Sequence, residues 1–267
     1  MPNFRVVFGG AIWQICKMRK VLLNAQFYTG LLLFTALYIP LALATVAVAS
    51  LFSSRRATFR RFRRAISLYG LVVVRVLPWP WIRVRSVGFD FARAPGPYVF
   101  VCNHRSASDA FLLSVLPVEG VQVANIWPFR LPVFGFFARW AGYLSVREMD
   151  PDDFFAQAGA LLRDGVCLGV FPEGTRSKDG RMGPFHGTVF RLALREPCTI
   201  VPVAIVGSER RPPKGSLLLE PGEIVLRQAP PIPSASFRDW PPFRLKTHVR
   251  DVLIDAIGEE EGGRSEQ

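Results

Sequence analysis

The sequence predicts an α/β domain in which helices cover a layered sheet, preceded by an N-terminal helical segment embedded in a membrane. Two observations support this. From about residue 84, short apolar runs alternate with longer amphipathic stretches, which is typical of strands followed by helices. Before that body, residues 21–54 carry no charge at all. The first pattern predicts the layered domain and the second predicts the membrane segment.

The net charge of +12 is concentrated in the N-terminal third of the chain. No acidic residue precedes Asp90, and the body that follows is nearly neutral. A nucleic-acid-binding domain would carry its excess positive charge on the folded body. The distribution therefore favours an anionic membrane surface as the partner and excludes nucleic acid. The cysteines are spaced unlike metal ligands, and no metal is expected.

The uncharged segment 21–54 would form a helix roughly 50 Å long, whereas a bilayer core is about 30 Å thick. Pro40 lies near its middle. Either one tilted helix spans with residues near 28–51, or two half-helices bend at Pro40 within one leaflet. The segment is too long for a secretory signal. The arginines of RRATFRRFRR (55–64) favour the cytoplasmic side of the inner membrane. Residues 1–65 are therefore predicted to be a membrane anchor with a basic flank.

The stretch ISLYGLVVVRVLPWPWIRV (66–84) begins the predicted globular domain, residues 66–258. It is interpreted either as an interfacial helix anchored by Trp79 and Trp81 or as ordinary core. Strands are then predicted at residues 97–104, 121–126, 143–146, 166–171, 199–207 and from 223. Helices are predicted at residues 108–116, 132–142, 150–165, 187–196 and 242–258. Residues 259–267 are predicted to be a disordered acidic tail.

The turn NHRSASD (103–109) follows a predicted buried strand directly. Polar residues at the carboxyl end of such a strand lie where α/β proteins bind ligands. A helix beginning near Ser106 would place Asp109 in its first turn, from which it can point back to His104. A carboxylate bonded to one imidazole nitrogen makes the other nitrogen a better base. The alternative is a pair that merely ties the loop.

FPEGTRS (171–177) follows a second apolar strand in the same manner. Glycine allows a ligand to approach the backbone, and arginine offers a planar fork of donors suited to phosphate. Arg147 follows a third short strand, and a second guanidinium in the same cleft would complete a phosphate site. The candidate binding residues are thus Arg147, Glu173, Gly174, Thr175 and Arg176. His186, in GPFHGT (183–188), is interpreted as a loop histidine.

These stretches together resemble the glycerolipid acyltransferase family, which acylates lysophosphatidic acid. NHRSASD matches its NHx4D motif, and GYLSVRE (142–148) is similar to its second motif, a glycine-led strand ending in arginine. FPEGTRS and VPVAI (201–205) match the third and fourth motifs, in the same order. The resemblance extends over roughly residues 84–232.

The resemblance implies transfer of an acyl chain from coenzyme A or acyl carrier protein to the free hydroxyl of a lysophospholipid. The first candidate acceptor is 1-acyl-sn-glycerol-3-phosphate, which would give phosphatidic acid. No cofactor is implied beyond the acyl thioester. His104 would be the general base and Asp109 would orient it. Residues 173–176 would hold the head group, with Arg147 on its phosphate.

Two departures from the family pattern leave the acceptor open. NIWPFRLPVFG (125–135) contains only Arg130 where many relatives are rich in lysine, and His186 stands where relatives often have lysine. Both reduce positive charge, so a lyso-ornithine lipid or another lysolipid remains an alternative. Two further classes also remain: a lipid hydrolase with Ser106 or Ser108 as nucleophile, and a membrane-tethered lipid-binding protein that uses Arg55–Arg64.

Overall fold

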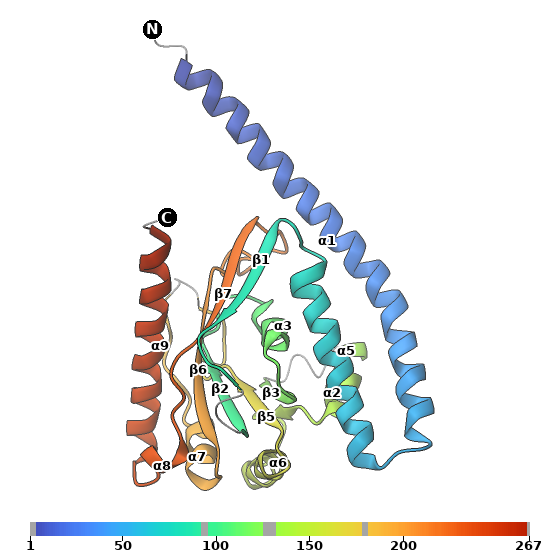
Figure 1. The fold of residues 1–267 in the computed structure, drawn as a ribbon, viewed down its shortest axis with the longest axis vertical. Helices are drawn as coiled ribbons and strands as arrows, with labels where there is room; N and C mark the ends of the chain where they lie inside the picture. Colours follow the sequence, from blue (N-terminus) through green and yellow to red (C-terminus); the bar gives the residue numbers. More distant parts are fainter. Residues whose placement is uncertain (1–3, 92–95, 125–131, 178–180, 266–267) are drawn as a thin grey trace.

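The computed structural model describes residues 4–91, 96–124, 132–177 and 181–265. Seven strands form one mixed sheet in the order β1-β7-β6-β2-β5-β3-β4 (Figure 1). The strands are β1 Ile82–Val87, β2 Tyr98–Cys102, β3 Gly120–Ala124, β4 Leu144–Ser145, β5 Cys167–Val170, β6 Thr199–Val206 and β7 Gly222–Gln228. The five strands from β6 to β4 are mutually parallel, whereas β7 is antiparallel to β6 and carries β1 beside it in parallel. The predicted α/β class is confirmed.

Helices cover both faces of this sheet (Figure 1). They are α1 Phe4–Ser50, α2 Arg55–Leu71, α3 Asp109–Leu112, α5 Pro132–Ala141, α6 Pro151–Arg163, α7 Thr188–Arg195, α8 Ser234–Phe237 and α9 Pro242–Ser265. One hydrophobic core packs α6, α7, α8 and α9 against one face of the sheet. A second core packs α1, α3 and the π-helical turn Val72–Val76 against the other face.

Burial on both faces explains why the sequence of strand β2 contains no alternation of polar and apolar residues. All five of its residues are buried. Val99 and Val101 belong to the core under α9, whereas Phe100 belongs to the core on the opposite face. Burying each such side chain contributes about 1.5–3 kcal/mol. A strand covered on both faces is therefore continuously apolar, and it fixes the position of the turn that follows it.

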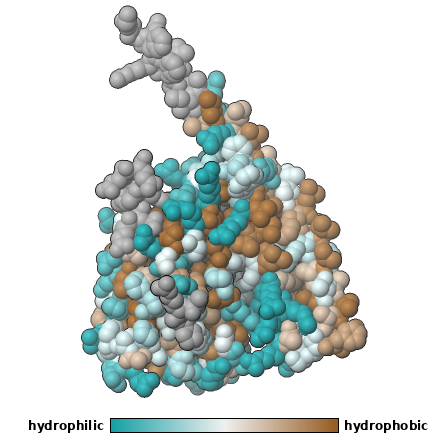
Figure 2. All heavy atoms as spheres, viewed as in Figure 1, coloured by the Kyte–Doolittle hydropathy of each residue, from teal (hydrophilic) through white to brown (hydrophobic). Residues whose placement is uncertain are grey.

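Helix α1 is one continuous helix of 47 residues with Pro40 inside it. Proline removes one backbone hydrogen bond, and the helix continues past it. Within the part of the chain that the structure describes, Trp13–Ser50 is the one helix long and apolar enough to cross a membrane, and 6% of its most apolar window is buried. Hydrophobic side chains gather along this helix on the surface (Figure 2).

The predicted boundary between residues 65 and 66 falls inside α2, which packs on the globular domain. Phe62 lies against Phe137 of α5 with ring centroids 6.0 Å apart. Arg63 is buried and donates from Nε to Glu119 Oε1 at 2.7 Å. Arg60 also pairs with Glu119, at 3.0 Å. Part of the arginine cluster that was expected to face lipid therefore holds α2 to the domain.

Two further differences concern the ends of predicted elements. The stretch 66–84 is interpreted above as an interfacial helix or as ordinary core, whereas its residues from Ile82 form strand β1. This strand is specified by pairing with β7, which lies about 140 residues away in the chain and is invisible to local pattern. The tail 259–267 was expected to be disordered, but α9 continues through Ser265. Glu259, Glu260 and Glu261 favour helix, and extending an existing helix needs no new nucleation.

Candidate active site

The two polar turns predicted from the sequence lie side by side at one edge of the sheet. Strands β2 and β5 are parallel neighbours, and Val101 pairs with Val170. The turns that follow these two strands therefore leave the same edge. Ser177 confirms their proximity, because its backbone N–H donates to the carbonyl oxygen of His104 at 2.9 Å.

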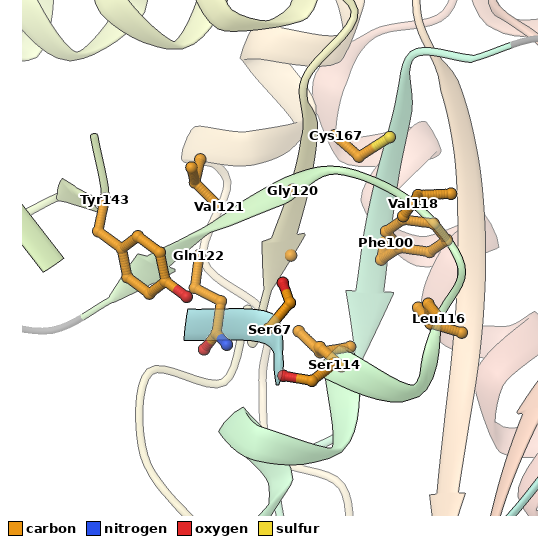
Figure 3. A pocket seen from close by; sticks show the side chains of 12 residues that line it. Ser67, Phe100, Ser114, Leu116, Val118, Gly120, Val121, Gln122, Tyr143 and Cys167 are labelled. Atoms are coloured by element: carbon orange, nitrogen blue, oxygen red, sulfur yellow. The ribbon is translucent and has the colours of Figure 1, made fainter. Parts of the chain in front are cut away.

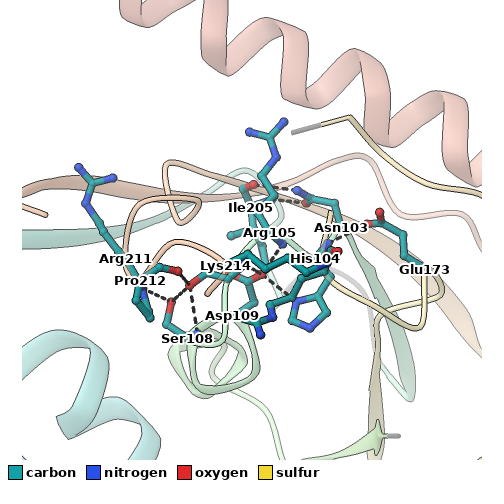
Figure 4. A network of polar contacts seen from close by, with 12 residues as sticks. Asn103, His104, Arg105, Ser108, Asp109, Glu173, Ile205, Arg211, Pro212 and Lys214 are labelled. Atoms are coloured by element: carbon teal, nitrogen blue, oxygen red, sulfur yellow. Dashed lines mark hydrogen bonds and ion pairs between the residues drawn. The ribbon is translucent and has the colours of Figure 1, made fainter. Parts of the chain in front are cut away.

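His104 and Asp109 are in direct contact (Figure 4). Oδ2 of Asp109 lies 2.9 Å from Nδ1 of His104, and the carboxylate is fully buried while the imidazole is 20% exposed. The same oxygen accepts hydrogen bonds from the backbone N–H groups of Arg105 at 2.6 Å and Ser106 at 2.7 Å. An ionised carboxylate only accepts, so Nδ1 carries the proton and donates. The lone pair of the imidazole is then on Nε2.

Phe171 fixes the plane of the imidazole. Its ring centroid lies 4.6 Å from that of His104, with 33° between the ring planes. Phe171 is the first residue after β5, so the second turn supplies the surface on which the histidine of the first turn rests. The ring of His104 is thus held by a hydrogen bond at one atom and by packing on one face.

Glu173 has a different environment from the one predicted. Its side chain is buried, with Oε1 accepting from the backbone N–H of His104 at 2.8 Å and Oε2 accepting from that of Gly183 at 2.8 Å. The sequence predicted that this carboxylate holds the acceptor head group. In the structure it ties the His104 turn to the loop before α7.

The remaining residues of the EGTR turn (173–176) are more accessible. Gly174 has a φ of +67°, and a Cβ there would lie 3.0 Å from Nε2 of His186, so both backbone conformation and space favour glycine. Thr175 is exposed and Arg176 is half-buried. Among the residues that the structure describes, the Arg176 guanidinium has no ion-pair partner. This turn therefore presents a backbone glycine and a guanidinium at the sheet edge.

Arg147 lies farther from the other candidates. It is exposed and follows β4, which is separated from β2 by β5 and β3. Three strand spacings amount to roughly 14 Å. Within the described ranges, no contact joins Arg147 to the His104 turn. Arg130, the single cation of the stretch 125–135, lies outside the residues that the structure describes.

Comparison with known proteins gives one consistent result. A family model described as Acyltransferase matches residues 83–206, a range that contains all four motifs. The chain is 26% identical over 242 residues to a 1-acyl-sn-glycerol-3-phosphate acyltransferase of Cocos nucifera, covering 80% of this chain and 75% of that protein. It is 27% identical to the alpha form of that enzyme from Bos taurus, covering 93% and 84%.

Residues 83–206 therefore form an acyltransferase domain, and the chain is similar to the glycerolipid acyltransferases. It is therefore an enzyme of the O-acyltransferase class. The crystal structure of PlsC from Thermotoga maritima shares the fold, with a TM-score of 0.73 and 24% identity, covering 92% of this chain and 98% of that one.

Two serines of this acyltransferase that were considered as hydrolase nucleophiles have structural partners. Ser106 is fully buried, and its Oγ donates to the carbonyl oxygen of Pro212 at 3.0 Å. Oγ of Ser108 donates to the carbonyl oxygen of Arg211 at 2.8 Å. Both hydroxyls are directed away from the imidazole and toward the loop between β6 and β7. These contacts argue against the hydrolase alternative.

The cysteine under the site is also unsuited to nucleophilic attack. Cys102 ends β2 and is fully buried. Burial, and to a smaller extent the negative charge of Asp109, raises the pKa of its thiol well above the ordinary value. The thiolate is the reactive form of cysteine. The acyltransferase therefore keeps this side chain protonated near neutral pH.

Asn103 is a site residue that the sequence analysis did not single out. Its buried amide donates from Nδ2 to the carbonyl oxygen of Ile205 at 2.9 Å and accepts from the Ile205 N–H at 2.7 Å. This reciprocal pair continues the β2–β6 ladder by one residue. It places the backbone of His104 accurately relative to the sheet. Its position directly before the histidine was the signal available in the sequence.

A small cavity of about 40 Å³ lies on the helix α2 side of the sheet (Figure 3). Ser67 of α2 lines it together with Val121 of β3 and Gly169 of β5. A Cβ on Gly169 would lie 2.5 Å from Leu113, so glycine allows the α3 region to pack closely there. No residue of the His104 turn lines this cavity, and it is separate from the imidazole of His104.

Proposed function

We propose that this acyltransferase moves an acyl chain from acyl-CoA or acyl-ACP to the free hydroxyl of a lysophospholipid. The first candidate acceptor is 1-acyl-sn-glycerol-3-phosphate, which gives phosphatidic acid. The names of the matched relatives support this acceptor. The observation that carries the chemistry is the 2.9 Å contact between Nδ1 of His104 and buried Asp109.

In the proposed reaction, Nε2 of His104 accepts the proton of the acceptor hydroxyl as its oxygen attacks the thioester carbonyl. The tetrahedral intermediate then collapses, the carbon–sulfur bond breaks, and the imidazolium returns the proton to the departing thiolate. A new ester and a free thiol result, and no acyl-enzyme forms. Asp109 holds the imidazole in the required tautomer and stabilises its positive charge during the reaction.

The EGTR turn is the proposed site of the phosphate. Arg176 offers a guanidinium without an ion-pair partner among the described residues, and a planar fork binds phosphate in bidentate fashion. Gly174 and Thr175 would give the head group close access to the backbone. We assign Glu173 the role of a positioning residue, since both carboxylate oxygens accept from backbone N–H groups. An extended Arg147 side chain would approach the phosphate from the β4 side.

The proposed location is the cytoplasmic face of the inner membrane. The long apolar helix α1 supports membrane attachment. The arginines that follow it support the cytoplasmic side, because cytoplasmic flanks of membrane segments are enriched in Lys and Arg. There the enzyme would meet both a membrane-bound acceptor and a soluble acyl thioester.

The proposal is tested by product analysis. The full chain, reconstituted in phospholipid vesicles, is offered lysophosphatidic acid with either acyl-CoA or acyl-ACP, and the lipids are analysed by mass spectrometry. Phosphatidic acid carrying the donor's acyl chain is the expected product. Absence of any acylated product from a panel of lysolipids with both donors would refute the proposal and favour a lipid-binding protein.

A second acceptor, a lyso-ornithine lipid, is favoured by one observation. His186 lies beside Gly174, at a position where the family often has lysine, so the EGTR turn carries less positive charge. Competition between lysophosphatidic acid and lyso-ornithine lipid measures the preference directly. His186→Lys is expected to shift the product ratio toward phosphatidic acid if charge at this point selects the acceptor. An unchanged ratio would show that it does not.

A further inference from the structure

The loop between β6 and β7, residues 207–221, joins two parts of the molecule that are distant in the chain. We call it the β6–β7 loop. On one side it contacts α1, where Asn24 forms a reciprocal pair with Leu219: Nδ2 donates to the leucine carbonyl at 2.9 Å, and Oδ1 accepts from its N–H at 2.8 Å. Lys20 also pairs with Glu220 at 2.9 Å. The loop is thus bound to the beginning of the uncharged segment.

On its other side the same loop contacts both candidate active-site turns (Figure 4). Its backbone carbonyls accept from Ser106 and Ser108 in the His104 turn. Lys214 donates from Nζ to the carbonyl oxygen of Arg176 at 2.8 Å. The loop therefore forms one wall of the site while it holds α1.

The base of the β6–β7 loop is closed by Arg211. Its Nη2 donates to the carbonyl oxygen of Pro221 at 2.7 Å, and its Nη1 donates to that of Gly207. One guanidinium thus ties the first residue of the loop to the last. A loop closed in this manner holds its tip at a defined place relative to the His104 turn and to α1.

The tip of the loop exposes two adjacent leucines. Leu217 is 74% exposed and Leu218 is 53% exposed, whereas Leu219 is buried against α1. Single exposed apolar residues are ordinary, but these two continue an apolar surface. The hydroxyl of Tyr28 on α1 donates to the Leu217 carbonyl, and exposed Val21 and Leu22 lie on the same stretch of that helix. The leucines therefore extend the apolar surface of α1 toward the active site.

We propose that Leu217 and Leu218 enter the lipid bilayer beside α1, making the β6–β7 loop a second membrane contact. This inference rests on the proposed function, in which the acceptor is a membrane lipid. A one-tailed lipid carries its free hydroxyl in the head-group layer, so a site that leaves its substrate in the bilayer must lie at that depth. The loop contacts α1 and the His104 turn and would also contact the bilayer. It would therefore set the depth of the active site relative to the head-group layer. Basic Arg210 and Lys214 precede the tip in the loop, where anionic head groups would lie.

The insertion is tested by fluorescence quenching with the full chain in phosphatidylethanolamine–phosphatidylglycerol vesicles whose acyl chains are brominated. An environment-sensitive probe is attached to Leu217→Cys or Leu218→Cys in a Cys16→Ser background. The remaining cysteines are buried and have raised pKa values, so they label slowly. A probe on Asp255→Cys, exposed on α9, is the matched control. Quenching at 217 and 218 but not at 255 is expected, and equal absence of quenching at all three positions overturns the inference.

The functional consequence is tested with the double variant Leu217→Asp and Leu218→Asp. Its rate with an acceptor embedded in vesicles is expected to fall on the order of tenfold or more, because two aspartates replace the leucines that would enter the apolar part of the bilayer. Its rate with a short-chain acceptor dissolved as a monomer is expected to remain unchanged. Ile254→Asp, at an exposed apolar position on α9, should match the wild type in both assays.

The two assays separate the inference from the function on which it rests. A double variant that matches the wild type on vesicles, with unquenched probes at the tip, overturns the membrane contact and leaves the acyltransferase reaction intact. A wild-type chain that acylates no acceptor, while probes at the tip are quenched, refutes the proposed function and leaves the membrane contact supported.

Discussion

Nδ1 of His104 and Oδ2 of Asp109 lie 2.9 Å apart, and the aspartate is fully buried behind the histidine. The same oxygen accepts hydrogen bonds from the backbone N–H groups of Arg105 and Ser106, in the turn before α3. The carboxylate thus shapes the turn as well as the imidazole. Any substitution of Asp109 tests both functions at once, and only a comparison of activity with folding separates them.

Asp109→Asn is expected to lower kcat by about 10²–10⁴-fold. The neutral amide removes the negative charge that stabilises the imidazolium during the reaction, and its oxygen is a weaker acceptor for the proton on Nδ1 than a carboxylate oxygen. Membrane binding and helix content, measured by flotation and circular dichroism, should persist. A variant that turns over at the wild-type rate would show that the carboxylate has only a structural role.

Glu173→Gln is expected to reduce stability and kcat together. Glutamine can accept only one of the two backbone N–H groups that the carboxylate accepts, which leaves a buried donor unpaired at a cost of about 1–3 kcal/mol in the free energy of unfolding. Thermal unfolding in detergent and steady-state kinetics measure the two effects. Glu223→Gln, which removes a surface pair with Arg85, is the matched control and should cost less than about 1 kcal/mol. A rise in the acceptor KM alone, at unchanged stability, would place the head group on Glu173 instead.

Arg176→Ala is expected to raise the apparent KM for a phosphate-bearing acceptor by about ten- to a hundredfold, the equivalent of one charged hydrogen-bonding group. The KM for the acyl thioester should change little, because the guanidinium is assigned to the acceptor. Arg195→Ala, on α7 and stacked over Phe155, is a control distant from the EGTR turn. If the acceptor KM stays at its wild-type value, the phosphate binds elsewhere.

The cysteines should differ in their reaction with a maleimide at pH 8. Burial raises the pKa of Cys167 to about 11 and that of Cys198 to about 12, and it raises that of Cys102 as well. The assay pH of 8 lies below the raised pKa of each of these thiols, so they stay protonated. The protonated form of cysteine is unreactive. Intact-mass measurement should show one adduct, at exposed Cys16, in the folded protein and four after unfolding. Rapid modification of Cys102 in the folded chain would contradict the burial of the strand beneath the site.

The sequence was sufficient for those parts of the site that depend on local structure. The contact between His104 and Asp109 spans five residues, so the strand–turn–helix pattern around it was enough to predict it. The proximity of the EGTR turn followed from a rule about parallel strands rather than from any contact. Both predictions rested on strands whose continuous apolar character is unambiguous.

The parts that the sequence did not predict depend on contacts between distant residues. Glu173 accepts from a backbone N–H 69 residues away, and the β6–β7 loop accepts from serines more than a hundred residues away. Local composition makes such a carboxylate look like a ligand for substrate. Arg63 was misinterpreted for the same reason, because its partner Glu119 is 56 residues away in the chain.

The most direct test of the proposed mechanism is the rate of acyl transfer by His104→Ala in vesicles, with product measured by mass spectrometry. The loss of a general base predicts a fall of about 10²–10⁴-fold in kcat. Asp109 keeps its two backbone hydrogen bonds in this variant, so thermal unfolding and flotation should match the wild type. Turnover within a few-fold of the wild type by this folded, membrane-bound variant would contradict the assignment of His104 as the base.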